Sequence, residues 1–314
     1  MPEEAGQTVG LLEVVIPTFD RLWALPRVVQ FYLDQPEIGR VIVVDDRSTD
    51  GTEAWLNEAA RREPRLHPVR HERNRGASAA RNTGADASRA PFVFFADDDM
   101  VLTPADGLAH MVGEMDRQKA DIAVPVHIVP ESGLPAELPP VEISFAGPSP
   151  RIFRPWTLEL RSRAELAGTA LPASFFSPLA CGLMLMRRAV LDRVRYDEGL
   201  GATSYRDETD FQLKALHEGF RLLACARPVV VDLDRNAGGG GCHALNSLAS
   251  YEWNAWKNNW KLLRRHRAVI RERIGLRAPV LVLQTCFVMH HLVHRLLRQY
   301  AGRILRACGL MKKL

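Results

Sequence analysis

The sequence predicts an α/β protein with a doubly wound, mostly parallel sheet and a helical C-terminal extension. Over about the first hundred residues, short apolar runs alternate with segments that have helical periodicity. Apolar runs without interspersed polar residues are typical of strands that are buried on both faces of a parallel sheet. Alternation of such strands with helices builds an open sheet that is covered by helices on its two sides.

Each element of this sheet can be placed on the sequence. The expected strands are 13–16, 41–44, 66–69 and 91–95. The expected helices between them are 22–33, 52–62 and 77–87. Open sheets of this kind bind ligands beyond the carboxyl ends of their strands. We therefore expect a ligand site where the strands end in Pro17-Thr18, Asp45-Asp46 and Asp97-Asp98-Asp99.

The regular alternation stops near residue 126. Residues 129–155 are rich in Pro, Gly and Ser, which indicates a linker and the start of a second lobe. Apolar runs return at 181–186, 222–224 and 229–231, and four consecutive glycines at 238–241 predict a hinge. We expect three parts: a ligand-binding domain at 11–126, a second lobe at 127–240 and a basic helical extension at 241–314.

Charge is distributed unevenly along the chain. The net charge is only +4, but residues 261–314 hold thirteen Lys and Arg and one acid, which gives them +12 and leaves −8 for the rest. The longest apolar stretch, 278–289, is shorter than the roughly 20 residues that a bilayer-spanning helix needs. We therefore expect no membrane-spanning helix and a tail that differs electrostatically from the body.

Cysteine usage and the N-terminal residues predict the compartment. The chain has five cysteines without a CxxC pair, which argues against a disulfide framework and against a structural zinc site. Residues 1–10 contain two acids, no basic residue and no apolar run, so a secretory signal is not expected. The expected location is the cytoplasm.

Five motifs in a fixed order give the chain a resemblance to a known family. They are VIPTFD at 15–20, VVDDRSTDGT at 43–52, NRG at 74–76 with ARNTG at 80–84, FADDD at 95–99 and RDETDF at 206–211. With these motifs the chain resembles family 2 glycosyltransferases of the A-type, Rossmann-like fold over roughly residues 11–235. The resemblance implies inverting transfer of a sugar from a nucleoside-diphosphate sugar to an acceptor hydroxyl.

The first two motifs predict the nucleotide pocket. A carboxylate at the end of the second strand can accept the imide N–H of uracil or bind a ribose, although residues 46–51 also fit a helix-capping turn. The resemblance places Asp46 against the base and Pro17 and Thr18 in the same pocket. UDP is the expected nucleotide, and GDP and dTDP remain open.

The aspartate cluster predicts a divalent metal, Mg²⁺ or Mn²⁺. Three adjacent carboxylates repel one another unless they share a cation, and hard cations prefer oxygen ligands. The resemblance makes Asp99 the direct ligand, with Asp97 or Asp98 reaching the ribose or a metal-bound water. The alternative is a solvated acidic turn. His243 is a candidate further ligand or an ordinary surface histidine.

Asp207 and Glu208 are the candidate catalytic acids. They precede a predicted helix at 211–219, where capping explains part of the motif. The resemblance implies that one of them takes the proton of the acceptor hydroxyl. Alignment on Asp210-Phe211 puts Glu208 at the position of the base, and Asp207 is the alternative.

Three further predictions concern single side chains. Arg81 lies near the nucleotide, pairs with the aspartates, or forms a purely structural ion pair. Gly182 allows the backbone to approach the sugar closely. Trp253, Trp256 and Trp260 share one helical face and are expected to pack against the body, with sugar stacking as the alternative.

The predicted activity is metal-dependent transfer from a nucleoside-diphosphate sugar to a glycan, a lipid-linked acceptor or a small molecule, without a nucleic-acid partner. One alternative is a sugar-phosphate nucleotidyltransferase, but the Gly-rich basic loop of that class is not found at 17–20. The other is a non-catalytic nucleotide-sugar-binding protein.

The basic tail adds a prediction about the membrane. On residues 292–308 a helical wheel separates apolar side chains from Arg295, Arg298, Arg303 and Arg306. This pattern predicts peripheral contact with an anionic membrane, which would be the inner face of the cytoplasmic membrane. Packing of the same helix on the acidic body is the alternative.

Overall fold

The computed structural model describes residues 10–130, 153–154, 158–160, 174–180, 182–200, 204–233 and 248–307. Beyond residue 293 it describes the backbone of the last helix but not its side chains. His243 and the glycines at 238–241 lie outside the described residues, as do the side chains on which the helical wheel of 292–308 mainly depends.

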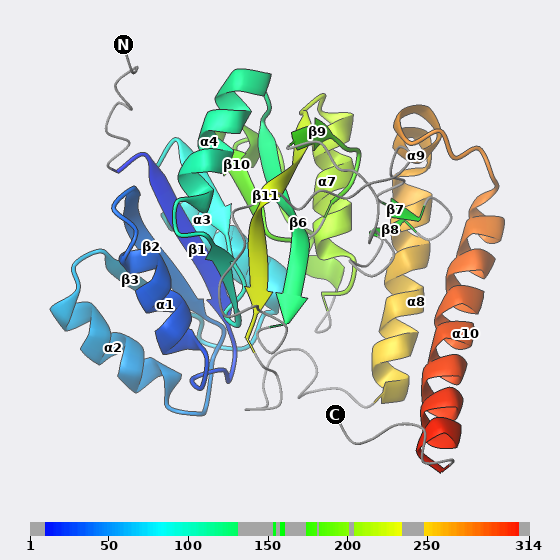
Figure 1. The fold of residues 1–314 in the computed structure, drawn as a ribbon, viewed down its shortest axis with the longest axis horizontal. Coiled ribbons are helices and arrows are strands. Elements are labelled where there is room, and N and C mark those ends of the chain that lie inside the picture. Colours follow the sequence, from blue (N-terminus) through cyan, green and yellow to red (C-terminus); the bar gives the residue numbers. More distant parts are fainter. Residues whose placement is uncertain are drawn as a thin grey trace.

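The N-terminal half of the sheet is parallel, as predicted. Strands β1 (Leu12–Thr18), β2 (Ile38–Asp45), β3 (Leu66–Arg70) and β4 (Phe92–Phe95) lie in the order β3-β2-β1-β4 (Figure 1). Helices α1 (Leu25–Leu33) and α2 (Thr52–Arg62) cover one face, and α3 (Ala77–Ala87) covers the other. Successive side chains of β1 follow this division, because Val14 packs with the first core and Val15 with the second.

The second half of the sheet is mixed. Strand β10 (Met184–Arg187) lies antiparallel between β4 and β6 (Ile122–Pro130). Strand β11 (Leu222–Asp232) runs parallel to β6, and β5 (Met100–Thr103) and β9 (Ser174–Phe176) pair antiparallel with β11. Residues 222–224 and 229–231, two separate apolar runs in the sequence, form this single strand with a register shift between Cys225 and Val229. The predicted fold class, a mostly parallel doubly wound sheet with a helical extension, is confirmed.

Smaller elements complete the body. Helix α4 (Gly107–Gln118) packs on the first core, and strands β7 (Phe153–Arg154) and β8 (Glu159–Leu160) form a separate pair. Helix α6 (Arg188–Leu191) and a 3₁₀ turn, η2 (Glu198–Leu200), connect β10 to α7 (Asp207–His217). The expected domain boundary at residue 126 falls within β6, and the sheet takes strands from both sides of it. The division into three parts stays a prediction.

The C-terminal helices form a separate layer at one side of the sheet (Figure 1). Helices α8 (Leu248–Arg265), α9 (Arg267–Arg273) and α10 (Val280–Ala307) share a third apolar core with α7. The described part of this core consists of Leu158, Leu179, Leu213, Leu262, Leu263, Val269, Ile270 and Leu283. Within the described residues, no helix has the length and apolarity required to cross a bilayer.

The expected packing is wrong for Trp253 and Trp260, whereas Trp256 is half-buried and its indole Nε1 is buried. Trp253 is 66% exposed and Trp260 is 37% exposed. Helix α8 instead buries a face that contains Ala255, Asn258 and Leu262. Asn258 donates hydrogen bonds to the backbone oxygens of residues 200 and 205, at 2.7 and 3.2 Å, so a polar side chain holds the helix on the body, and Trp253 and Trp260 point outward.

Candidate functional site

The carboxyl ends of β1 and β4 bring the first predicted residues together. Asp97 to Asp99 follow directly after β4, whose neighbour β1 ends at Thr18. The Thr18 hydroxyl donates to Asp98 Oδ2 at 2.8 Å. The backbone N–H of Leu233, one residue after β11, donates to the carbonyl of Asp99 at 2.8 Å, which places the aspartates at the carboxyl end of β11 as well.

Two arginines face the aspartate cluster. Arg21 forms an ion pair with Asp99 and lies 3.4 Å from Asp98 Oδ1. Arg81 reaches Asp97 Oδ1 from the other side at 3.1 Å. Burial raises the pKa of Asp98 to about 7, against the opposing effect of Arg21. The two guanidinium groups therefore leave at least one of the three carboxyls poorly stabilised as an anion.

The donor chemistry fits the predicted Mg²⁺ or Mn²⁺, because three carboxylates supply hard oxygen ligands and an added cation would offset the burial of Asp98. Within the described residues, however, no three acid, His or Cys side chains converge in an arrangement that holds a metal. Asp97, Asp98 and Asp99 are turned toward Arg81, Thr18 and Arg21 respectively. The assignment of Asp99 as ligand stays a prediction, and His243 lies outside the described residues.

Arg81 connects the aspartate cluster to the predicted catalytic acids. It projects from α3, and its side chain is only 6% exposed. One terminal nitrogen donates to Asp207 Oδ2 at 2.6 Å, and the other lies 3.1 Å from Asp97 Oδ1 and 3.3 Å from Glu208 Oε1. Of the three roles that the sequence allows for Arg81, the structure favours pairing with the aspartates, and it extends this pairing to α7.

The two catalytic candidates have different surroundings. Asp207 is buried, and its Oδ2 accepts hydrogen bonds from Arg81 and, at 3.2 Å, from Ser78. Its Oδ1 accepts the N–H of Glu208 at 2.8 Å. The Glu208 side chain is 32% exposed, and burial together with the adjacent Asp207 raises the pKa of Glu208 to about 8. Glu208 thus combines a partly exposed side chain with a pKa raised to about 8, which suits a general base.

Gly182 lies against Glu208. A Cβ added at Gly182 would stand 2.8 Å from Glu208 Oε1 and 2.9 Å from its Cγ, so only glycine leaves room for this side chain. The nearby backbone of Ala180 is held by Gln212 of α7, whose amide accepts its N–H at 2.9 Å and donates to its carbonyl at 3.2 Å. The structure thus gives Gly182 a contact with the candidate base, and its approach to a sugar stays a prediction.

Asp46 organises the loop between β3 and α3. Its carboxylate lies 2.7 Å from His71 Nδ1 and accepts the backbone N–H groups of Arg75 and Gly76 at 2.8 and 2.7 Å. The neighbouring Asp45 accepts the N–H of Ser48 at 2.8 Å and pairs with Arg70. Asp46 is thus buried and bonded within its own chain. Its contact with a base, like that of Pro17 and Thr18, stays a prediction.

Sequence reasoning missed two partners of the site, Arg21 and His71. Arg21 comes one residue after the first motif, and its partner Asp99 lies 78 positions further along the chain. His71 follows β3 directly and bonds both Asp46 and the hydroxyl of Thr83, the latter at 2.9 Å. His71 could have been found, because it is a polar residue that directly follows a predicted parallel strand. No comparable signal marked Arg21.

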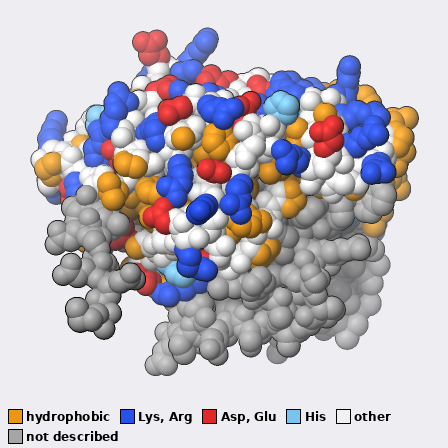
Figure 2. Space-filling model, turned by 90° about the horizontal axis from the view of Figure 1, so that it is seen from above, with side chains coloured by type: hydrophobic (Ala, Val, Ile, Leu, Met, Phe, Trp, Pro, Cys, Tyr) orange, Lys and Arg blue, Asp and Glu red, His pale blue; other side chains and the backbone are white. Residues whose placement is uncertain are grey.

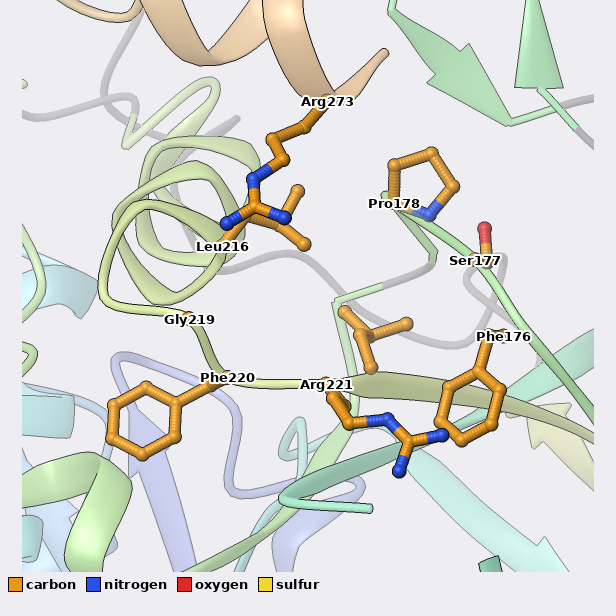
Figure 3. Close-up of a pocket in the computed structure, with 9 residues that line it drawn as sticks. Phe176, Ser177, Pro178, Leu216, Gly219, Phe220, Arg221 and Arg273 are labelled. Atoms are coloured by element: carbon orange, nitrogen blue, oxygen red, sulfur yellow. The ribbon is translucent and has the colours of Figure 1, made fainter. Parts of the chain in front are cut away.

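A hollow of about 320 Å³ lies elsewhere on the molecule, at the start of β11 (Figure 3). Phe176, Phe220, Arg221 and Arg273 are among its lining residues, and the Arg221 guanidinium lies 3.9 Å from the centroid of the Phe176 ring. None of the residues predicted for the site lines it. The carboxylate cluster at the strand ends therefore remains the candidate active site.

Sequence comparisons relate the chain to glycosyltransferases. Residues 13–194 match the family model described as glycosyl transferase family 2. The uncharacterized glycosyltransferase YaiP of Escherichia coli is 24% identical over 86% of this chain, which spans 62% of the length of that relative. The succinoglycan biosynthesis protein ExoU of Rhizobium meliloti is 27% identical over 84% of this chain and 76% of its own.

Solved structures show the same fold at low sequence identity. Residues 1–349 of Staphylococcus aureus TarS, in complex with UDP-GlcNAc, superpose with a TM-score of 0.55 at 16% identity, over 88% of this chain and 70% of that one. GalNAc-T7 with UDP, GalNAc and Mn²⁺ superposes with a TM-score of 0.55 at 16% identity, over 84% of this chain and 56% of that one.

Proposed function

The chain belongs to glycosyltransferase family 2, and on this basis we propose that it transfers a sugar from a UDP-sugar to an acceptor hydroxyl, with inversion at the anomeric carbon. The observation that carries the proposal is the position of Arg81. This one buried side chain bridges Asp97 of the cluster to Asp207 and Glu208 of α7. The aspartates proposed to act on the leaving diphosphate and the candidate base thereby lie close together at the carboxyl ends of the strands.

In this reaction the acceptor oxygen forms a bond to the anomeric carbon while the bond from that carbon to the diphosphate breaks. The diphosphate leaves with the electron pair, and Glu208 takes the proton of the acceptor hydroxyl. Asp207 cannot fill this role as readily, because both of its oxygens already accept hydrogen bonds. Instead, Asp207 fixes the guanidinium of Arg81 beside Asp97.

Asp97, Asp98 and Asp99 would hold the divalent cation, with Asp99 as the direct ligand. The cation supplies positive charge that stabilises the departing diphosphate. Arg21 neutralises part of the cluster from the side of β1. We place the nucleotide beside Pro17, Thr18 and Asp46, since Pro17 and Thr18 end β1 and Asp46 directly follows the neighbouring strand β2.

Two of the solved structures with this fold contain UDP or a UDP-sugar, and one of these also contains Mn²⁺. Their ligands support the choice of donor and cation. ExoU is named for succinoglycan biosynthesis, which supports a glycan as acceptor, free or attached to a lipid. A small-molecule acceptor is the remaining class. We place the reaction in the cytoplasm, because five cysteines without a CxxC pair suit a reducing compartment.

Release of UDP tests the proposal. The protein is incubated with a set of UDP-sugars and with Mn²⁺ or Mg²⁺, and the free UDP is measured. Glu208→Gln is expected to lower turnover about a hundredfold or more while nucleotide binding persists. The matched control is Glu218→Gln, because Glu218 lies at the far end of α7 and pairs with the exposed Arg193.

A nucleotidyltransferase would form pyrophosphate or a nucleotide sugar from sugar phosphate, and a binding protein would release nothing. If no UDP-sugar gives metal-dependent UDP release, the proposed reaction is wrong. If Asp207→Asn is inactive while Glu208→Gln is nearly normal, Asp207 is the base.

A further inference from the structure

The outer face of helix α8 is a stripe of aromatic and basic residues. The side of α8 that packs on the body contains Ala255, Asn258 and Leu262, all of them buried. On the opposite side Trp253 and Trp260 are 66% and 37% exposed, and the exposed Lys257 and Arg264 alternate with them at helical spacing.

Helix α10 continues this surface with an apolar face. Its inner side packs through Leu283 and Phe287, which are 3% and 0% exposed. Its outer side exposes five large apolar residues: Leu281, Val282, Met289, Leu292 and Val293, which are 67%, 44%, 53%, 39% and 46% exposed. Contiguous apolar side chains on a helix surface mark a contact with another apolar phase or another molecule.

The two faces adjoin because α8 and α10 pack antiparallel (Figure 1). The Gln284 side chain bonds Asn259 at 2.8 Å and the carbonyl of Trp256 at 3.1 Å, and His291 lies 3.8 Å from Glu252. These contacts set Trp253 about level with Met289, and Trp260 about level with Leu281.

We call this combined surface the α8–α10 face and define it by six residues: Trp253, Lys257, Trp260, Leu281, Met289 and Leu292. Seen from above, hydrophobic side chains gather at the right-hand edge of the molecule, the side on which α10 lies in Figure 1 (Figure 2).

We propose that the α8–α10 face binds the headgroup region of a bilayer that contains anionic lipids. Trp beside Lys or Arg, next to an apolar face, is the composition of helices that lie in a membrane interface. Residues 261–314 carry a net charge of +12. Helix α10 contains no Asp or Glu, and the one acid of α8, Glu252, is turned toward His291.

A second copy of the chain fits this surface less well. A two-fold symmetric contact brings the same patch of two copies together, and here it would place basic residues of one copy against those of the other. An anionic lipid surface instead complements both the charge and the apolar side chains.

The position of the α8–α10 face relative to the candidate active site deepens the proposed function. The carboxyl ends of β6 and β11 and the last part of α10 lie at the same end of the molecule (Figure 1). Asp99 lies at this end of β11, because its carbonyl accepts the N–H of Leu233. A bilayer bound to the α8–α10 face therefore lies beside the end of the molecule that holds the aspartates. An acceptor carried on a lipid would then be close to the candidate active site. This choice of acceptor rests on the proposed function, whereas binding of the bilayer does not.

Vesicle sedimentation tests the proposal with the full chain. The probes are vesicles of phosphatidylcholine alone and vesicles of phosphatidylcholine mixed with phosphatidylglycerol. The protein is expected to sediment with the mixed vesicles about tenfold more strongly than with the neutral ones, and less at high salt. The triple variant Trp253→Ser, Leu281→Ser, Met289→Ser is expected to lose this binding about tenfold or more. Matched controls are Leu11→Ser and Phe176→Ser, which remove apolar side chains that are 42% and 44% exposed away from α8 and α10.

Sedimentation of the triple variant equal to that of the unmodified protein would overturn the proposal, as would the absence of binding to mixed vesicles. A dimer in light scattering that the triple variant abolishes, without vesicle binding, would assign the α8–α10 face to a second copy and also overturn it. Release of UDP without vesicles is measured on the same variant and should be unchanged. If the unmodified protein, the triple variant and the controls all fail to release UDP, this counts against the proposed function. The result of the vesicle experiment would still stand.

Discussion

Substitution of Gly182 by alanine tests whether the position of the Glu208 carboxylate controls turnover. The added Cβ would lie 2.8, 2.9 and 3.0 Å from Glu208 Oε1, Cγ and Cδ, whereas ordinary van der Waals contacts lie at 3.4–4 Å. The whole side chain, and not only its tip, must therefore move by about 1 Å. A displacement of this size at a reacting group costs about a hundredfold in rate.

Turnover of Gly182→Ala is measured as UDP release at saturating donor, and its stability by urea unfolding. The free energy of unfolding should change by only about 1 kcal/mol, because a flexible side chain absorbs the clash. Gly113→Ala is the matched control, since a Cβ at Gly113 in α4 meets nothing within 4 Å. That variant should keep full activity and gain about 0.5–1 kcal/mol from the higher helix propensity of alanine.

A folded Gly182→Ala enzyme with full turnover would refute this reasoning, because Glu208 would then not need its present position. Loss of nucleotide binding in the same variant would also contradict it, since the clash involves only the candidate base.

Three further predictions follow from the same cluster. Asp99→Ala should abolish sugar transfer and weaken Mn²⁺-dependent UDP binding, measured by calorimetry. The control Asp86→Ala, which changes an exposed aspartate, should do neither. Full activity of a folded Asp99→Ala protein would reject the metal assignment. Arg81→Met leaves the buried Asp207 without its guanidinium partner and should lower the free energy of unfolding by about 3–5 kcal/mol. The exposed control Arg61→Met should lower it by about 0.5 kcal/mol. Equal losses of stability in the two variants would show that the buried ion pair is unimportant. Because burial raises the pKa of Glu208 to about 8, kcat/KM should rise with pH up to about 8. The folded state holds this proton more tightly than the unfolded chain, so the free energy of unfolding should fall as pH rises from about 4.5 toward 8. A kcat/KM that does not change over this pH range would contradict the assignment of the base.

The sequence predicted the elements with local signals well. Helices 52–62 and 77–87 have the predicted bounds, because Gly51 and Gly76 directly precede them in backbone conformations with positive φ, and the strands before and after them are short apolar runs. The antiparallel insertion of β10 was not predictable in this way, since the choice of neighbours in a sheet depends on residues far apart in the chain. The outward positions of Trp253 and Trp260 were missed because Asn258 and Asn259 hold the buried face of α8.

The candidate site shows the same division between local and distant information. The motifs predicted that Asp97 to Asp99 and Asp207-Glu208 carry the chemistry, but motifs do not state which side chain joins them. Arg81 pairs with residues 16, 126 and 127 positions away, and these contacts appear only when α3 and α7 pack on the same face of the sheet. Arg21 reaches Asp99 only because β1 and β4 are neighbours.

The C-terminal helices take part in holding α7, the helix that carries the two candidate catalytic acids, in place. Arg206, directly before α7, donates to Asn259 of α8 at 3.0 Å and to the carbonyl of Leu158 at 2.9 Å. One turn into α7, the buried Asp210 lies 2.8 Å from Nε2 of His266, at the junction of α8 and α9. Burial alone would raise the pKa of Asp210, but hydrogen bonds from His266 and Lys214 lower it to about 2, so this carboxylate stays charged throughout the neutral range.

These contacts give the tail a role at the site that does not depend on membrane binding. The Asn259 amide that supports Arg206 also bonds Gln284 of α10, so a continuous set of hydrogen bonds runs from α10 through α8 to the residue before Asp207. Asp207 in turn fixes Arg81 beside Asp97. Since a misplacement of about 1 Å at a reacting group is costly, the helices that present the α8–α10 face should also influence the position of the candidate base, Glu208. Surface changes on that face should therefore affect vesicle binding alone, whereas changes to its inner polar contacts should affect turnover in solution.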